Sequence, residues 1–417
     1  MKVFKFGGAS IKSQESIRNM SSIIQRFKGE QLVIVVSAMG KTTNNLESLF
    51  HQVIGREDHQ AKLREIMDYH LHISDQLVLT IKNQKGIDRA LKNFETIINQ
   101  TDPSDEKDRI YDRIISQGEI LSSTIVAAFL LESGLPVYWM DARKFIRTDP
   151  THREGRIDWS ATSSLIRDQL EPLLSSHLIV TQGFIGGTEN EITTTLGREG
   201  SDFTAAIIAS CLDAESVIIW KDVPGILNAD PKRFQDPKLY DHLSFQEAAE
   251  MTYYGASVIH PKTIKPLANK NIPLIVKSFE QPDSPGTRID QGGPHPLYPT
   301  YVVKDDQCLI SFLAKDLAFI NENNLSIIFH VLDMLNIKIN MMQNSAVSLT
   351  LCVDNHTSKV MKLIDSLKND FSIRFNEGLR LITIKNYSPA SIIHVSKDKK
   401  ILVEQRTRNT FQIVVTT

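Results

Sequence analysis

Short runs of hydrophobic residues recur along the first part of the chain. Each run is nearly continuous in apolar residues instead of alternating with polar ones, which is typical of parallel strands buried on both faces of a sheet. Between the runs, hydrophobic residues recur at spacings of three and four, as in helices that bury one face. The pattern predicts a layered α/β domain with a mostly parallel sheet. Its expected strands are Val3–Phe6, Leu32–Val36, Val137–Met140, Leu178–Thr181, Val217–Trp220 and Leu274–Val276.

Three segments between these strands have the periodicity of helices. We expect one helix at Leu121–Leu131, ending near Gly134, and another that begins at Asp202 and runs into an apolar segment. From Leu46 to about Ile115 no strand pattern occurs and the spacing is helical throughout. We therefore predict a helical subregion packed beside the sheet. His70 and His72 fall within it at a spacing of two, which places them on different faces of a helix and disfavours a metal pair.

The pattern changes after Gln291–Pro299, which is rich in Gly and Pro and which we interpret as a linker. Beyond it the expected order is βαββαβ, the ferredoxin-like arrangement. The last piece offers three more strands and little room for a full helix. We therefore predict one domain over residues 1–292 and a second region over residues 300–417. The expected elements of that region are strand Leu309–Leu313, helix Ser326–Leu335, strands Ile337–Met342 and Ser348–Val353, helix Ser358–Leu367, and strands Ser372–Phe375, Leu381–Lys385, Ile401–Gln405 and Gln412–Val415.

Composition and charge exclude several classes of function. With 417 residues, 41% of them hydrophobic, the chain is long enough for two or three globular domains. A net charge of -2 gives no electrostatic footprint for nucleic acid or an anionic membrane. No signal-like segment is evident, no apolar stretch approaches the ~20 residues that span a bilayer, and the three cysteines have no CxxC spacing. We expect a cytoplasmic protein whose partners are small molecules.

The stretch Thr195–Ala205 is the first candidate for chemistry. It places Gly197, Arg198, Gly200, Ser201 and Asp202 together, directly before the predicted helix. A flexible turn followed by a helix N-terminus suits an anion, because the turn lets the backbone approach closely and the helix dipole is positive at that end. The alternative is an ordinary surface loop in which Ser201 or Asp202 caps the helix.

Four other segments carry residues of the same kind, and four of these five segments follow a predicted strand. Ligands bind outside the carboxyl ends of the strands in an open parallel sheet, so these segments are expected to share one crevice. The sequence contains none of the nucleotide-binding motifs that we checked. Val35 stands where the first glycine of a Walker A motif would, and neither GxGxxG nor the catalytic-loop signature of protein kinases occurs. The four segments are Lys5-Phe6-Gly7-Gly8-Ala9-Ser10, Ser37-Ala38-Met39-Gly40 through Asn44, Ser116-Gln117-Gly118-Glu119, and Asp222-Val223-Pro224-Gly225 with Asp230-Pro231-Lys232.

Together these segments make the chain resemble the aspartate kinases. Seven motifs occur in that family's order within residues 1 to about 290: the five segments above, Gln182-Gly183-Phe184, and Gly255-Ala256-Ser257-Val258-Ile259-His260-Pro261. The remainder resembles tandem ACT domains, the second of them truncated. The resemblance implies the amino-acid-kinase fold and phosphorylation of the β-carboxylate of L-aspartate by ATP and Mg²⁺, the first step of lysine, threonine and methionine biosynthesis. It also implies a homodimer or higher homo-oligomer and a possible amino-acid effector at the ACT region.

By the same resemblance, Lys5 and Asp202 form the catalytic pair, with Asp202 orienting the lysine. Glu119 would bind the substrate ammonium and Arg198 its α-carboxylate, within a pocket completed by Ser37, Thr43, Phe184 and Ser201. Gly7, Gly8, Ser10, Gly197, Gly200, Lys221, Asp222, Asp230 and Lys232 are expected on the nucleotide, and no side chain is expected to form a dedicated metal site. Structural alternatives stay open: Glu119 at a helix start, Arg198 in a surface ion pair, Asp230 in a turn before Pro231.

The chain departs from the family pattern at several positions. Ser257 stands where many relatives carry Lys, Lys221 where Thr is common, and Glu199 where Gly is frequent. In the tail, Asn340 and Ala346 stand where lysine-sensitive relatives carry acidic residues, so we predict weak or absent inhibition by lysine alone. Two other functions stay open: an amino-acid kinase that uses another substrate such as glutamate, and an amino-acid sensor without activity.

Overall fold

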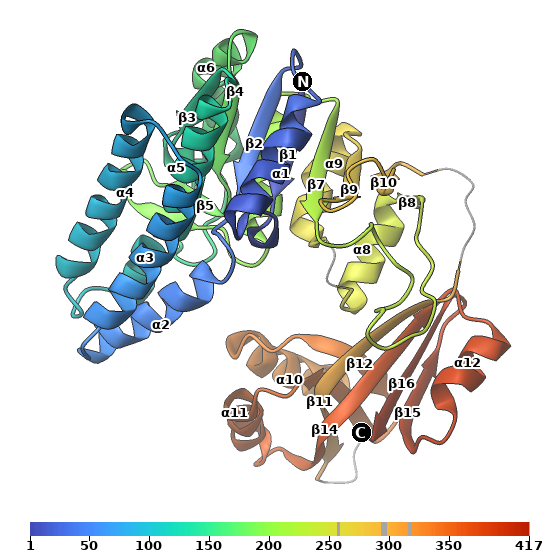
Figure 1. The fold of residues 1–417 in the computed structure, drawn as a ribbon. Coiled ribbons are helices and arrows are strands. Elements are labelled where there is room, and N and C mark those ends of the chain that lie inside the picture. Colours follow the sequence, from blue (N-terminus) through green and yellow to red (C-terminus); the bar gives the residue numbers. More distant parts are fainter. Residues whose placement is uncertain (257–258, 293–297, 316–318, 417) are drawn as a thin grey trace. The chain divides into compact units, whose positions relative to one another are not determined.

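The computed structural model describes residues 1–256, 259–292, 298–315 and 319–416. Within them the chain forms two compact units (Figure 1). The first contains Met1–Ile226, Leu239–Ala249 and residues 259–292, and the second contains Leu227–Lys238, residues 250–256 and the described residues from 298 onward. Two short segments that precede the predicted boundary thus group with the second unit. Part of the predicted linker, residues 293–297, lies outside the described residues.

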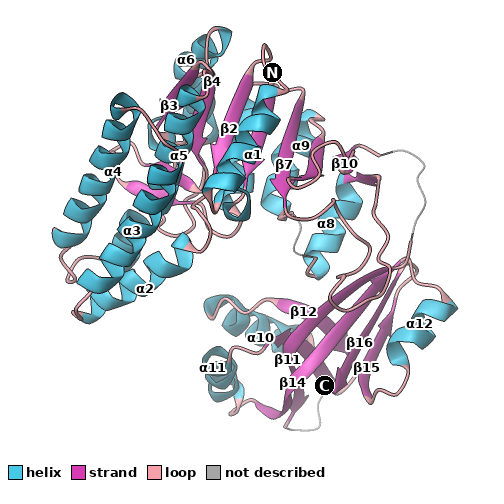
Figure 2. Cartoon of the chain, in the orientation of Figure 1, coloured by secondary structure: helices cyan, strands magenta, loops and turns pink. Residues whose placement is uncertain are grey.

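The first unit is built on an eight-stranded sheet, counted over the described residues, in the order β3-β4-β2-β1-β7-β9-β10-β8. Neighbouring strands are parallel except β9 and β10, which are antiparallel. All six predicted strands are present, so the predicted α/β class with a mostly parallel sheet is confirmed (Figure 2). The strands are β1 (Lys2–Phe6), β2 (Leu32–Val36), β3 (Val137–Met140), β4 (Leu178–Gln182), β7 (Ser216–Lys221), β8 (His242–Ser244), β9 (Leu274–Ser278) and β10 (Thr287–Asp290).

Alternate residues of the central strands point to opposite faces of this sheet. Phe4 and Phe6 of β1 join Trp220 in a hydrophobic cluster with residues of helices α1 to α5. Residues of odd number on β1, including Lys5, point to the other face, against which α7 packs. This alternation directs Lys5 toward the N-terminus of α7.

Helices cover both faces of the sheet. The predicted helix Leu121–Leu131 is the last part of a much longer helix, α5, which begins at Lys107 and contains Glu119 in its interior. The possibility of a helix-start position for Glu119 is therefore wrong. The helices are α1 (Gln14–Gln25), α2 (Thr42–Gly55), α3 (Gln60–Gln76), α4 (Ile81–Asn99), α5 (Lys107–Glu132), α6 (Trp159–Gln169), α7 (Gly200–Cys211), α8 (Phe245–Tyr254) and α9 (Pro261–Lys270), with 3₁₀ turns η1 (Gly8–Ile11), η2 (Ala142–Lys144) and η3 (Glu171–Ser175).

Helix α5 is also the one helix among the described residues that is long and apolar enough to cross a membrane. The sequence-based expectation concerned continuous apolar stretches and did not identify this helix, because polar residues such as Gln117 and Glu119 interrupt it. However, 89% of the apolar window of α5 is buried inside the unit. The hydrophobic residues of α5 thus belong to the core of the first unit, since they pack on the sheet and on α4.

The turn that precedes α7 does not follow a strand of the main sheet. It follows β6 (Thr193–Thr195), which pairs with β5 (Ile185–Gly187) in a separate antiparallel hairpin. Only three of the five candidate segments therefore follow main-sheet strands, not four. The hairpin was not predicted, because a run of three threonines lacks the apolar pattern of a buried strand.

The second unit contains a six-stranded antiparallel sheet, counted over the described residues, in the order β12-β13-β11-β14-β16-β15. Its first part has the predicted βαββαβ order. The strands predicted at Ser372–Phe375 and Leu381–Lys385 form one continuous strand, and the last piece contains a short helix, α12, that was not expected. The elements are β11 (Thr300–Ala314), α10 (Glu322–Met334), β12 (Ile339–Asn344), β13 (Ser348–Asp354), α11 (Thr357–Leu367), β14 (Phe371–Lys385), α12 (Pro389–Ser396), β15 (Ile401–Arg406) and β16 (Thr410–Thr416).

Candidate active site

A polar pocket, which we call the central pocket, lies in the first unit at the carboxyl ends of β1, β2 and β7. Its volume is about 490 Å³, a size that suits a small ligand. Residues from these strand ends meet there with the middle of α5 and the first turn of α7. The lining residues are Lys5, Gly8, Ser37, Ala38, Gly40, Thr43, Glu47, Tyr111, Glu119, Arg153, Phe184, Thr195, Gly197, Arg198, Glu199, Gly200, Ser201, Asp202 and Lys221.

Two lysines hold one buried carboxylate at the floor of the central pocket. Lys5 Nζ lies 2.7 Å from Asp202 Oδ1, and Lys221 Nζ lies 3.4 Å from Asp202 Oδ2. Burial alone would raise the pKa of Asp202, but the charges of Lys5 and Lys221 outweigh it and hold this pKa below its ordinary value. Asp202 is therefore ionised at neutral pH, and the three side chains together leave one net positive charge in the pocket.

Glu119 faces the same pocket from the interior of α5 and is only 3% exposed. The backbone N–H of Ala38 donates to its Oε1 at 3.3 Å, whereas its Oε2 has no hydrogen-bond partner among the described residues. Burial raises the pKa of Glu119 to about 8, against the opposing effects of the Ala38 bond and the charge of Lys5. A buried carboxyl with one unpartnered oxygen is suited to receive a cationic group of a ligand.

The turn before α7 brings the backbone close to Phe184. A Cβ added to Gly200 would lie 2.7 Å from the Phe184 ring, so the close approach requires glycine there. Gly197 has φ 74° and begins the turn, and the N–H of Gly200 donates to its carbonyl oxygen. The sequence-based prediction of a tight turn at the start of a helix is confirmed.

Glu199 occupies the left-handed region with φ 54°, which is uncommon for a residue other than glycine. Its Oε2 is buried and has no hydrogen-bond partner among the described residues. Burial raises the pKa of Glu199, while Lys221 opposes and Asp202 reinforces this shift. The pocket thus contains a second carboxylate with an oxygen that no described group satisfies.

Most of the predicted site residues come together in this pocket. Those on its lining are Lys5, Gly8, Ser37, Thr43, Glu119, Phe184, Gly197, Arg198, Gly200, Ser201, Asp202 and Lys221. Gly7, Ser10 and Asp222 are not on the lining; the hydroxyl of Ser10 donates to the carbonyl oxygen of Trp220. Asp230 and Lys232 belong to the second unit. There the N–H of Lys232 donates to Asp230 Oδ1 at 2.9 Å, a contact that agrees with the alternative role of Asp230 as a turn residue before Pro231.

Sequence reasoning missed three polar residues of the pocket, Glu47, Tyr111 and Arg153, whereas Thr195 belongs to the candidate stretch Thr195–Ala205. The Tyr111 hydroxyl donates to Glu47 Oε1 at 3.0 Å, and the Arg153 guanidinium lies 4.0 Å from the centre of the Tyr111 ring. The backbone N–H of Arg153 donates to the buried Asp112. No local motif marks these residues, because their position depends on the packing of α5 against distant loops.

Comparison with known proteins agrees with this geometry. A family model described as the amino acid kinase family matches residues 1–278. The chain is 31% identical over 390 residues to the lysine-sensitive aspartokinase 3 of Escherichia coli strain K12. The aligned residues cover 92% of this chain and 86% of that protein. The chain belongs to the amino acid kinase family, and within it to the aspartokinases.

Other aspartokinases extend the comparison. The chain is 34% identical over 306 residues to a chloroplastic bifunctional aspartokinase/homoserine dehydrogenase of Zea mays, covering 69% of this chain and 32% of that longer protein. The crystal structure of E. coli aspartokinase III in complex with aspartate and ADP has a TM-score of 0.87 and 28% identity, covering 100% of this chain and 96% of that one. The resemblance to aspartokinases indicated by the seven motifs is confirmed, although Ser257 lies outside the described residues.

Proposed function

We propose that this aspartokinase carries out phosphoryl transfer from ATP to aspartate in the central pocket, with Lys5 and Asp202 as its catalytic pair. The observation that carries the proposal is the buried Lys5–Asp202–Lys221 cluster at the ends of β1 and β7. It is the kind of charge arrangement that phosphoryl transfer needs, because little covalent chemistry is left to the protein beyond positioning and charge stabilisation.

The chemical difficulty of the reaction is repulsion between two anions. The β-carboxylate of aspartate has an ordinary pKa of about 3.9, so it is already ionised at neutral pH and needs no general base. Bringing it to ~4 Å of a phosphate charge costs about 4 kcal/mol per unit pair at an effective dielectric constant near 20. The positive charge of Lys5 and Lys221 offsets this repulsion. Asp202 orients the lysines and remains ionised.

Aspartate would bind through groups on either side of this cluster. Glu119 offers an unpartnered buried oxygen to the ammonium group, and Arg198 at the mouth offers a guanidinium to the α-carboxylate. Arg153 is a second guanidinium on the same lining. The small polar side chains Ser37, Thr43 and Ser201, with the ring of Phe184, would complete the pocket.

The nucleotide would bind beside Lys221, along the glycine-rich turns of Gly8 and of Gly197 to Gly200. Their backbone N–H groups and the N-terminus of α7 suit phosphate oxygens. We also retain five residues of the family motifs as proposed contributors to nucleotide binding: Gly7, Ser10, Asp222, Asp230 and Lys232. E. coli aspartokinase III was crystallised with ADP, which supports ATP as the phosphoryl donor here.

Glu199 fits the magnesium ion that the reaction is expected to use. Mg²⁺ in kinases typically binds one or two carboxylates, phosphate oxygens and several waters. The buried, unpartnered Oε2 of Glu199 is a donor of that type, next to the proposed phosphate site. When bound, the ion would neutralise phosphate charge. Glu199 would hold it, while Lys5 and Lys221 keep their contacts with Asp202.

The assay that tests the proposal traps the acyl phosphate with hydroxylamine. Aspartate-dependent hydroxamate is expected from the wild type and not from Lys5→Ala. Lys2→Ala is the matched control, because Lys2 lies on the same strand but pairs with Glu30 away from the pocket. Equal activity of both variants would contradict the catalytic assignment. L-Glutamate in place of aspartate is expected to give no hydroxamate.

We further propose that the enzyme is cytoplasmic and that it forms a homodimer or a higher homo-oligomer, the latter because of the ACT-like tail of the second unit. Light scattering is expected to give at least twice the mass of the chain, and a monomeric mass would contradict the proposed oligomer. Cell fractionation is expected to leave the enzyme with the cytoplasmic fraction. Recovery with membranes or outside the cell would contradict that location.

A further inference from the structure

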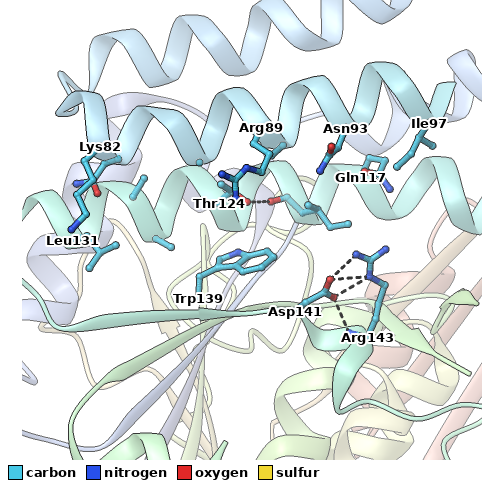
Figure 3. Close-up of a pocket in the computed structure, with 16 residues that line it drawn as sticks. Lys82, Arg89, Asn93, Ile97, Gln117, Thr124, Leu131, Trp139, Asp141 and Arg143 are labelled. Atoms are coloured by element: carbon cyan, nitrogen blue, oxygen red, sulfur yellow. Dashed lines mark hydrogen bonds and ion pairs between the residues drawn. The ribbon is translucent and has the colours of Figure 1, made fainter. Parts of the chain in front are cut away.

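A second pocket lies in the first unit on the side of α5 that faces away from the central pocket. We call it the α4–α5 pocket, because these two helices form its sides and β3 with the following turn forms its base (Figure 3). Its volume is about 510 Å³, in the range of small-molecule sites. None of its lining residues lines the central pocket.

The base of the α4–α5 pocket is apolar and fixed in position. Ala127, Ala128 and Leu131 of α5 form one apolar side, and the Trp139 ring lies opposite α4 (Figure 3). The indole N–H of Trp139 donates to Ser123 Oγ at 3.0 Å, which holds the ring in one orientation. Such a preformed apolar surface suits a flat or aliphatic group of a ligand.

The rim of this pocket is positively charged. Lys82 and Arg89 extend from α4 toward the pocket and have no acidic partner among the residues that the structure describes (Figure 3). The third cation, Arg143, is paired with Asp141 at 2.6 Å. The formal charge of the lining is therefore positive by two, and the nearby Glu132 accepts hydrogen bonds from Thr80 and Asn83 instead.

We propose that the α4–α5 pocket binds a small amphipathic anion, with an apolar body against Trp139 and a carboxylate, sulfonate or phosphate at Arg89 and Lys82. An apolar base beneath two unpaired cations matches such a ligand in both shape and charge. A neutral apolar ligand would leave both cations unused, and a purely ionic one would leave the indole face uncovered.

Binding at this pocket would act on the central pocket through α5. Ser123 Oγ accepts hydrogen bonds from Trp139 and from Gln182 Nε2, the latter at 2.7 Å. Gln182 leads directly into Gly183 and Phe184, and Phe184 lines the central pocket together with Glu119 of α5. A ligand pressed against Trp139 and α5 would therefore change the affinity for aspartate, a consequence that rests on the proposed function.

The test uses 8-anilinonaphthalene-1-sulfonate, an aromatic sulfonate whose fluorescence reports binding without reference to activity. We expect one site per chain with energy transfer from Trp139, and a decrease of that transfer in Trp139→Phe, in which Trp159 and Trp220 remain as donors. Arg89→Glu is expected to weaken binding by about tenfold or more, the usual range for a lost charged contact. Lys92→Glu is the matched control, since Lys92 is exposed on the same helix and outside the lining.

A second variant fills the pocket instead of changing its charge. Ala128→Leu is expected to reduce binding of the probe, and a melting temperature well above the assay temperature shows that the variant is folded. Displacement by indole-3-carboxylate but not octanoate would indicate an aromatic ligand, and the reverse an aliphatic one. Binding that neither Arg89→Glu nor Ala128→Leu reduces would overturn the proposal. An unchanged KM for aspartate at saturating probe would overturn the coupling to the central pocket.

Discussion

The ammonium group of Lys5 lies 2.7 Å from the carboxylate of Asp202, and both side chains are nearly inaccessible to solvent. The contact joins the end of β1 to the first turn of α7. A buried ion pair of this kind contributes little net stability, but breaking it leaves an uncompensated charge at a cost of about 3–5 kcal/mol. Its presence in the pocket agrees with the proposed function, in which it fixes a cation where phosphoryl transfer needs one.

The raised pKa of Glu119 predicts a pH dependence of aspartate use. The free enzyme carries a neutral Glu119 below a pH of about 8, whereas the substrate ammonium needs the ionised form. The kcat/KM for aspartate is therefore expected to rise with pH up to and through about 8, because this ratio reports ionisations of the free enzyme. Measurement of kcat/KM from pH 6.5 to 9 tests this. A flat profile in the wild type would refute it.

The same residue predicts a trend in stability. The pKa of Glu119 is raised from 4.5 to about 8 on folding, so the unfolded chain ionises first as pH rises. The free energy of unfolding should accordingly fall between pH 4.5 and 8, since the folded state then binds more protons than the unfolded state. In Glu119→Gln this contribution is absent. Urea unfolding at both pH values measures it, and an equal pH dependence in the two proteins would count against it.

Replacing Glu199 is predicted to change the magnesium requirement. Glu199→Gln keeps the shape of the side chain but removes the charge, and is expected to raise the Mg²⁺ concentration for half-maximal ATP binding by about tenfold or more. Calorimetric titration of ATP at several Mg²⁺ concentrations provides a readout independent of turnover. Glu154→Gln, a nearby acidic residue outside the lining, is the control. An unchanged Mg²⁺ dependence would exclude Glu199 as a ligand.

Two glycine-to-alanine changes are predicted to have opposite effects. In Gly200→Ala the new methyl group would lie 2.7 Å from the Phe184 ring, and overpacking of this kind typically costs about 1–3 kcal/mol. Aspartate affinity is expected to fall with it. In Gly86→Ala, within α4, nothing lies within 4 Å of the new methyl group, so a gain of about 0.5–1 kcal/mol from helix propensity is expected. Chemical denaturation of both variants measures these changes. A Gly86→Ala variant less stable than the wild type would contradict the open space found around this glycine.

Inhibition by lysine alone is predicted to be weak. Asn340 Oδ1 already accepts a hydrogen bond from Lys304 at 2.8 Å, and its Nδ2 donates to Gln307 and Asp354. The ammonium group of Lys304 is thus already bound to the side-chain oxygen of Asn340, and Ala346 carries no charge that could bind a lysine effector. Inhibition curves are expected to show no half-inhibition at submillimolar lysine, and the double change Asn340→Asp, Ala346→Glu is expected to increase sensitivity. Submillimolar half-inhibition of the wild type would disprove the prediction.

Local sequence patterns predicted much of the fold. The strands of the first sheet were predictable, because strands buried on both faces are apolar throughout. The continuity of α5 was not predicted, since polar residues such as Ser116 and Glu119, the latter facing the pocket, interrupt its apolar pattern. The hairpin of β5 and β6 was missed for a related reason: threonines beside a polar site do not show an apolar pattern.

The same distinction applies to the site. The presence of Lys5, Asp202 and Glu119 in the pocket could be predicted because each belongs to a short motif in the sequence. Arg153 and Tyr111 were not, because they reach the pocket only through packing between α5 and loops far away in the sequence. Glu199 was noticed as a departure, but its unpartnered oxygen became evident only from the folded structure.

The most direct test of the catalytic pair is a double-mutant cycle of kcat with Lys5→Met and Asp202→Asn. Each single change is expected to lower kcat by about 10²–10³-fold, as for other preorganised charge contacts. If the two residues act as a unit, the double variant should lose little more than Lys5→Met alone. Losses that simply multiply would show that Asp202 does not act through Lys5, and would contradict the role assigned to the pair.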